Sequence, residues 1–95
     1  MNLYILKNHR VVQAKNIAAW AQWFENIDNR IIELTVDKRK KITVSTVFIG
    51  IGDTELFETK VWVKGEGVNT FRASTWAKAK RLHTAVCRTY KAERV

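Results

Sequence analysis

The stretch from Ile42 to Val63 constrains the fold more than any other part of this 95-residue chain. Two segments rich in β-branched and aromatic residues, 42–51 and 55–63, flank the cluster Gly52-Asp53-Thr54, and neither segment contains proline. This composition is typical of long paired strands, and the cluster between them is typical of a turn. The stretch therefore predicts a long central β-hairpin against which shorter elements pack.

Pairing the two strands about the Gly52-Asp53-Thr54 loop places residues of like parity on one face of the hairpin. The odd-numbered face is largely apolar and is predicted to face the core; it carries Val47, Ile49, Ile51, Phe57, Val61 and Val63. The even-numbered face mixes apolar rings with charges, which makes it the first candidate for a contact surface; it carries Ile42, Val44, Thr46, Phe48, Leu56, Glu58, Lys60 and Trp62.

The segments before the central hairpin predict a small first hairpin, a helix and a strand. Residues 3–6 and 11–14 flank a turn at 7–10, whose Asn-His centre tolerates left-handed backbone and places His9 at an exposed tip. Asn16 is a suitable N-cap for a helix over 17–27, and 30–36 alternates as a strand. The apolar residues of this helix recur at helical spacing and predict a core stripe; they are Ile17, Trp20, Ala21, Trp23, Phe24 and Ile27.

After the central hairpin, a turn at 64–67 leads to a last strand at 68–73 and a terminal helix capped by Ser74 or Thr75. The inward face of this helix is predicted to carry Trp76, Ala79, Leu82, His83, Val86, Cys87 and Tyr90. The outward face carries Lys80, Arg81, Thr84, Arg88 and Lys91.

These elements predict one domain over residues 1–95, of α+β class. We expect an antiparallel sheet of four to six strands with the two amphipathic helices packed on one face. The single cysteine, Cys87, excludes an internal disulfide, and the N-terminus lacks a signal-peptide pattern, so the cytoplasm of the host cell is the expected location. The apolar runs are too short for a membrane span.

The net charge of +8 comes from two segments. Residues 75–95 hold six basic side chains against Glu93, residues 37–41 hold four against Asp37, and the rest of the chain is neutral. Concentrated cations favour a polyanionic or acidic partner, although a basic surface also serves solubility alone. The predicted partner-binding residues are Lys38, Arg39, Lys40, Lys41, Trp62, Lys78, Lys80, Arg81, Arg88 and Lys91.

Motifs for catalysis or cofactor binding are missing from the sequence. Gly50-Ile51-Gly52 is only a fragment of a dinucleotide-binding loop. His83 and Cys87 share a helical face, but a structural zinc needs four ligands, so His83 is predicted to be a packed residue that bonds a strand backbone or hydroxyl group. Thr46 and Glu58 are predicted to lie across the sheet from His83, which disfavours an acid–base group. We therefore expect no enzyme activity, no cofactor and no metal.

Several stretches resemble a family of small uncharacterised phage and prophage proteins. The matching motifs are Trp20-x-x-Trp23-Phe24-Glu25, Val44-Ser45-Thr46-Val47-Phe48-x-Gly50, Leu56-Phe57-Glu58-Thr59-x-Val61 and Ser74-Thr75-Trp76-x-x-Ala79-x-x-x-His83. Proteins of this type carry glutamates after the last tryptophan, where this chain has Lys78 and Lys80. The resemblance implies a viral origin and leaves the activity open.

The leading functional hypothesis is a non-enzymatic phage accessory protein that binds and modulates a host factor. The host factor is a protein or nucleoprotein complex, and inhibition of a defence system in the manner of an anti-CRISPR protein is the favoured case. The alternative is a small basic nucleic-acid-binding protein that uses its cationic helix and loop with exposed aromatic residues of the sheet. A homodimer through the even-numbered face of the hairpin remains open.

Overall fold

A four-stranded antiparallel sheet forms the body of the molecule, as seen in a computed structural model that describes residues 2–94. Its strands follow one another in chain order, because each is joined to the next by a hairpin connection. They are β3 (Ile31–Asp37), β4 (Ile42–Phe48), β5 (Phe57–Val63) and β6 (Glu66–Ala73). A second sheet holds only β1 (Tyr4–Lys7) and β2 (Arg10–Gln13), whose connection at Asn8 and His9 has positive φ at both residues.

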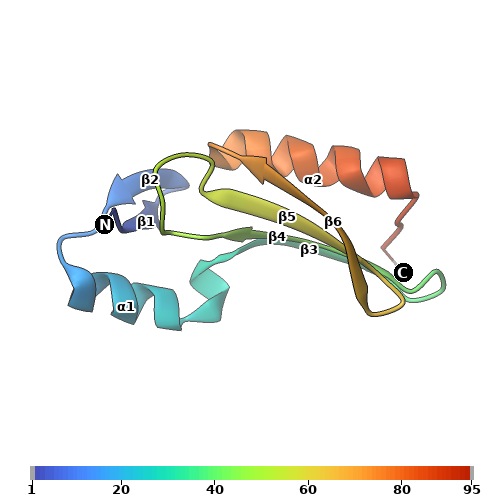
Figure 1. Cartoon of the computed structure of the whole chain (residues 1–95), viewed down its shortest axis with the longest axis horizontal. Helices are drawn as coiled ribbons and strands as arrows, with labels where there is room; N and C mark the ends of the chain where they lie inside the picture. Colours follow the sequence, from blue (N-terminus) through green and yellow to red (C-terminus); the bar gives the residue numbers. More distant parts are fainter. Residues whose placement is uncertain (1, 95) are drawn as a thin grey trace.

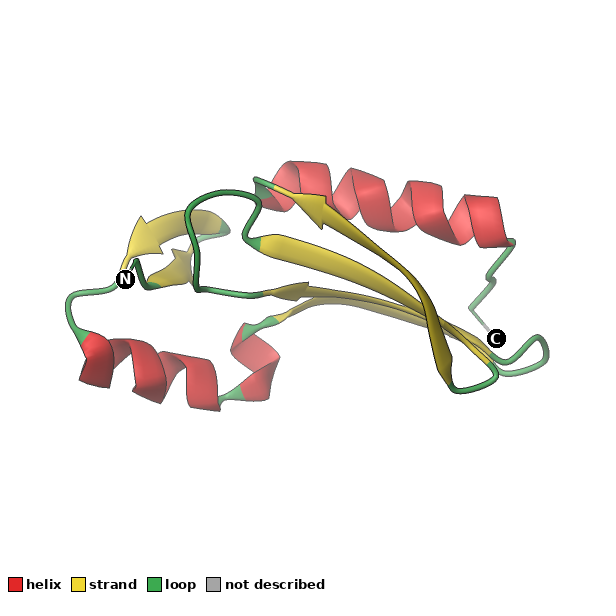
Figure 2. Cartoon of the chain, viewed as in Figure 1, coloured by secondary structure: helices red, strands yellow, loops and turns green. Residues whose placement is uncertain are grey.

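The helices lie in different places relative to the four-stranded sheet (Figures 1 and 2). α2 (Trp76–Tyr90) runs along one face of the sheet, whereas α1 (Ile17–Glu25) and the short 3-10 helix η1 (Ile27–Asn29) lie near β1 and β2. The α+β class and the four-stranded antiparallel sheet are therefore confirmed. The strands form two sheets, however, and the prediction that both helices cover one face is wrong.

The first helix packs less completely than its apolar stripe predicts. Asn16 caps it as expected, accepting a hydrogen bond from the Ala19 amide at 2.8 Å. Its aromatic side chains are half-buried, but Ile17 and Ile27 are 73% and 57% exposed. The reason is that α1 meets the small first hairpin and the chain around Gly50, rather than the broad face of the main sheet.

The register of the central hairpin differs from the prediction for β4. Thr46 pairs with Thr59 and Val44 with Val61, so even-numbered residues of β4 share a face with odd-numbered residues of β5. An even number of residues separates the paired ends of the two strands, because 49–52 leaves the hairpin and meets the N-terminal segment. There the Tyr4 amide donates to the Gly50 carbonyl at 2.8 Å. The predicted core face is thus correct for β5 and wrong for β4.

The core lies between the four-stranded sheet and α2. The strand residues that face the helix include Val44, Phe48, Phe57 and Val61, each at most 1% exposed. The predicted inward stripe of α2 is confirmed, since all of its members are buried or half-buried. Thr75 is the N-cap and accepts a hydrogen bond from the Lys78 amide. The opposite face of the sheet is left without a covering helix along most of its length (Figure 2).

Among residues 2–94, no helix has both the length and the apolar character that a membrane crossing requires.

Candidate binding surface

Three segments that are distant in sequence meet at one end of the molecule. The Lys64 amide of the β5–β6 turn donates to the Lys41 carbonyl at 2.8 Å, and Lys40 Nζ donates to the Lys91 carbonyl at 2.6 Å. Figure 1 shows the end of the chain beside the β3–β4 loop. We name this region the basic end, and it consists of Lys38, Arg39, Lys40, Lys41, Lys64, Arg88 and Lys91.

A buried carboxylate, that of Asp37, holds the segments of the basic end together. Asp37 is fully buried and accepts hydrogen bonds from the Glu93 amide at 2.9 Å and the Lys40 amide at 3.0 Å. These backbone bonds, with the Glu93 bond the stronger influence, hold the pKa of Asp37 below its usual value. The single carboxylate thereby ties the β3–β4 loop to the segment after α2. Its Oδ2 also lies 3.9 Å from Lys40 Nζ, whereas Lys38, Arg39 and Lys41 are exposed.

Three lysines of the basic end have left-handed backbone conformations. The φ angles are 57° at Lys41, 54° at Lys64 and 55° at Lys91. Lys64 and Gly65 both have positive φ, as in a type I′ turn, whose first position usually holds Asn or Gly. Lys91 occupies the left-handed C-cap of α2, where glycine is usual. A residue with a Cβ atom costs about 1 kcal/mol or more in this conformation, so lysine is not the choice that favours folding.

The outward face of α2 extends the positive surface. Lys78, Arg81 and Arg88 are exposed, and residues 76–90 contain no acidic side chain. Arg81 and Arg88 line a shallow groove floored by Thr84 and Ala85. Across residues 2–94, no carboxylate lies within ion-pair distance of these three cations.

Lys80 differs from the other predicted binding residues of α2. Its Nζ forms an ion pair with Glu33 at 2.8 Å and lies 5.6 Å from the centroid of the Trp76 ring. Burial alone would raise the pKa of Glu33, but the bond from Lys80 outweighs it, so the pKa is lowered and the carboxylate is charged. Lys80 is thus already engaged within the molecule, and the outward surface depends on Lys78, Arg81 and Arg88.

Trp62 lies on the open face of the sheet, which faces away from α2. It pairs with Thr43 on β4 and with Gly67 on β6, and it is half-buried. The predicted even-numbered contact face is therefore only partly real: Glu58, Lys60 and Trp62 are accessible there, while Ile42, Val44, Thr46, Phe48 and Leu56 are buried. Exposed apolar residues of β3 complete the open face, namely Ile31, Leu34 and Val36. Glu58 pairs with Arg72 across the strands at 3.1 Å.

A buried polar chain runs between the sheet and α2. His83 Nδ1 lies 2.7 Å from Thr46 Oγ1, which lies 2.6 Å from Thr59 Oγ1, and His83 Nε2 lies 2.9 Å from Thr35 Oγ1. The prediction of a packed histidine bonded to strand hydroxyl groups is confirmed. The prediction that Thr46 lies across the sheet from His83 is wrong, because the register of β4 turns its even-numbered residues toward the helix.

The side chains of this polar chain are buried. His83 is 1% exposed, and Thr46 and Thr59 are no more accessible. Burial lowers the pKa of His83, although the carboxylate of Glu33 at 3.9 Å opposes the shift. Burial also raises the pKa of the Cys87 thiol one helical turn further on. The imidazole of His83 and the thiol of Cys87 are therefore neutral, and together with Thr35 they line one side of a surface pocket that Glu33 and Arg94 also line.

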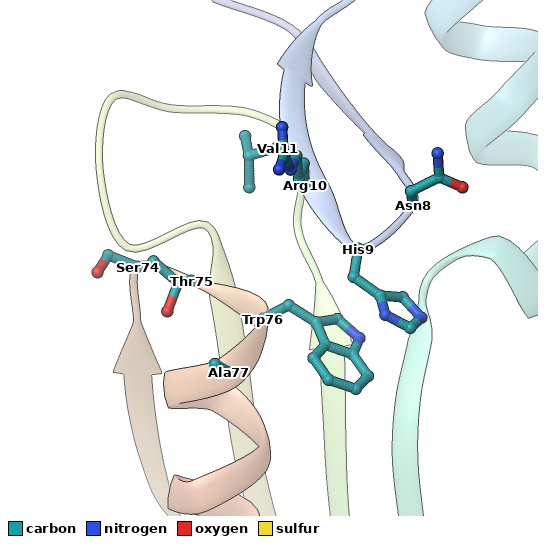
Figure 3. A pocket seen from close by; sticks show the side chains of 8 residues that line it. All are labelled: Asn8, His9, Arg10, Val11, Ser74, Thr75, Trp76 and Ala77. Carbon is teal, nitrogen blue, oxygen red and sulfur yellow. The ribbon is translucent and has the colours of Figure 1, made fainter.

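A pocket lies between the first hairpin and the start of α2 (Figure 3). It has a volume of about 560 Å³ and is lined by Asn8, His9, Arg10, Val11, Ser74, Thr75, Trp76 and Ala77. At its side the rings of His9 and Trp76 stack, with centroids 3.9 Å apart and planes within 5°. His9 is thus exposed as predicted, but it also docks the first hairpin onto α2, a contact that the turn motif alone does not indicate.

The chain was also compared with known proteins. Neither the protein-family models, the curated proteins nor the solved structures yielded a match.

Proposed function

We propose that this chain is a non-enzymatic accessory protein that binds and modulates a host factor through the basic end and the outward face of α2. The observation that carries the proposal is the gathering of exposed cations from the β3–β4 loop, the β5–β6 turn and the end of α2, where the carboxylate of Asp37 is buried. A surface of one sign attracts and orients a partner of the opposite sign. The partner surface is therefore acidic, formed by carboxylates of a protein or by phosphates of a nucleoprotein complex.

The internal chemistry supports a binding role. The histidine and threonines that would be needed for acid–base work are at most 6% exposed and already bond one another. A general base must reach a substrate proton within hydrogen-bond distance, and these groups are enclosed by α2. The accessible residues therefore favour binding of a partner at the surface.

The nature of the host factor follows from the resemblance to phage and prophage proteins. A small viral protein without catalytic machinery acts by occupying a surface of a larger assembly. A defence system of the bacterial host is the target class we favour, and a CRISPR complex is an example whose components include both protein and nucleic acid.

A plating experiment tests this function. The chain is expressed in bacteria that carry one member of a panel of defence systems, CRISPR systems included, and each strain is challenged with a phage that its system blocks. We expect plaque formation to recover for one system, and a tagged copy of the chain to purify with a component of that system. Unchanged plating across the panel, with no host component recovered in stoichiometric amount, would contradict the proposal.

Direct binding of nucleic acid is a second candidate function. One observation favours it specifically: Trp62, a half-exposed aromatic ring, is separated from Lys64 of the basic end by a single residue. Cations beside an accessible aromatic ring are the usual elements of a surface that holds phosphates and stacks a base.

A further inference from the structure

We infer that the basic end binds single-stranded nucleic acid, with backbone phosphates on Lys41 and Lys64 and an unpaired base stacked on Trp62. The inference rests on the proposed function, since it concerns the same surface, and it names the chemistry of the partner there. Three observations carry it: the type of cation, the backbone at the lysines, and the position of the tryptophan.

The basic end is rich in lysine and poor in the residues that anchor protein–protein contacts. Its lysines outnumber its arginines, Arg39 and Arg88, and the one aromatic residue between its members in the sequence, Tyr90, is half-buried. The core of a protein–protein interface is depleted in lysine and enriched in aromatic residues. Phosphate-binding surfaces instead use lysine and arginine as point charges that displace counterions. The composition therefore favours phosphates over an acidic protein surface.

The left-handed backbone conformation at Lys41, Lys64 and Lys91 also favours a phosphate ligand. Glycine would relieve the left-handed conformation at each position, yet each position carries a cation. At Lys91 the dipole of α2 gives a cation a separate stabilising role, but Lys41 and Lys64 lie in strand connections without that benefit. Solubility does not require charge at the strained positions, because neighbouring unstrained residues could supply it. A ligand that contacts these sites accounts for the choice of lysine.

Trp62 is placed to receive a base from a strand held by these lysines. It lies on the open face, one residue pair before the Val63–Glu66 pair that closes the β5–β6 turn, with Thr43 and Gly67 on either side. Gly67 has no side chain, and a Cβ atom there would lie 3.7 Å from Trp62 Nε1. Lys60 Nζ lies over the ring, 5.3 Å from its centroid, so a base stacks on the other face of the indole or displaces this cation.

The position of the ring selects single strands over duplexes. A base presents its flat face to an indole only when it is unpaired and turned out of a stack. In a duplex the faces of each base are covered by the neighbouring bases. The lysines could still contact phosphates, but Trp62 would have no base on which to stack. A single strand satisfies both groups at once.

Variants at the left-handed lysines provide the sharpest test, because glycine at those positions does not threaten folding. The triple variant Lys41→Gly, Lys64→Gly, Lys91→Gly removes three charges and relieves the backbone. A control of equal net charge is Lys7→Ala, Arg10→Ala, Lys15→Ala, whose sites are exposed and lie in the N-terminal part of the chain. Trp62→Ala removes the ring alone. Urea denaturation confirms that each variant folds.

Binding is measured by anisotropy of a fluorescent oligothymidylate over a series of salt concentrations, beside a duplex of equal length. We expect the wild type to prefer the single strand. The triple glycine variant should lose about tenfold or more in affinity and flatten the slope of log K against log salt by about 1.4, as the loss of the phosphate contacts at Lys41 and Lys64 requires. Trp62→Ala should lose about tenfold with the slope unchanged. The control triple variant should retain most of the affinity.

The inference is overturned if the wild type does not bind the oligothymidylate, or if the triple glycine variant binds as tightly as the control. If the wild type does not bind the oligothymidylate but still restores plaque formation in the plating experiment, the partner is an acidic protein. The proposed function would then stand without the inference. Salt-dependent oligonucleotide binding without any effect on plating would support the inference and count against the host-factor function.

Discussion

At the scale of single residues, His83 shows how one polar side chain selects a register. Its ring bonds hydroxyl groups of two strands, Thr46 on β4 and Thr35 on β3. A slip of β4 that replaced Thr46 by Val47 would leave a buried ring nitrogen without a partner, which costs about 1–3 kcal/mol. The buried chain therefore helps to specify which face of β4 meets the helix.

His83 also predicts how stability depends on pH. Burial lowers its folded pKa, so below the unfolded value of about 6.5 the unfolded chain binds a proton that the folded chain resists. The free energy of unfolding should be highest above about pH 6.5 and fall as the pH decreases toward the folded pKa, by at most about 1.4 kcal/mol per pH unit from this group. Lys80 and Arg94 nearby act in the same direction as burial, and Glu33 opposes it.

Urea denaturation over a range of pH measures this dependence. His83→Gln keeps hydrogen-bonding groups in the core but does not titrate, so its unfolding free energy should be flatter between about pH 7 and pH 5. Equal slopes for the wild type and His83→Gln would show that His83 titrates alike in both states, contrary to its burial.

At the scale of elements, the contact between α1 and the end of β4 depends on Gly50. Its φ is +77°, and a Cβ atom there would lie 3.0 Å from Phe24 Cε2 and 3.2 Å from Trp20 Nε1. Gly50→Ala should therefore destabilise the protein by both backbone strain and steric overlap, roughly 2–4 kcal/mol in total. The midpoint and slope of urea denaturation report the loss.

Gly65→Ala is the matched control for this substitution. Gly65 has a similar φ of +82°, but no atom lies within 4 Å of the added Cβ. It should cost only the backbone strain, about 1–2 kcal/mol. If the two alanine variants were equally stable, α1 would not pack on Gly50 as described.

The comparison of these elements explains what the sequence could and could not predict. The composition of each segment predicts its structure, because β-branched runs, Asn16 and Thr75 act locally on the backbone. The pairing of β4 with β5 depends instead on how many residues of 49–56 stay in the hairpin, and 49–52 turns away to meet Leu3 and Tyr4. That long-range competition has no local signal, so the inward face of β4 was predicted wrongly.

At the scale of the whole molecule, the two ends have different compositions. The described residues extend over 43 × 22 × 22 Å. One end holds the first hairpin and α1, with aromatic packing around Gly50 and the pocket beside Trp76; the other brings together two strand connections and the end of α2. Clustering of cations along the sequence predicted Lys38–Lys41 and α2 as binding segments. It missed Lys64, because an isolated lysine in a turn is distinctive only once the fold places it beside Lys41.

The central claim is that the basic end, with Trp62 beside it, is the surface that meets a polyanion. Backbone amide shifts in a two-dimensional NMR titration with unlabelled oligothymidylate test this claim residue by residue. We predict that the shifts concentrate on Lys38–Lys41, Trp62–Lys64 and Arg88–Lys91, and that Lys7–Arg10 stays unchanged. Shifts centred on the first hairpin, or spread evenly over exposed lysines of both ends, would contradict the account.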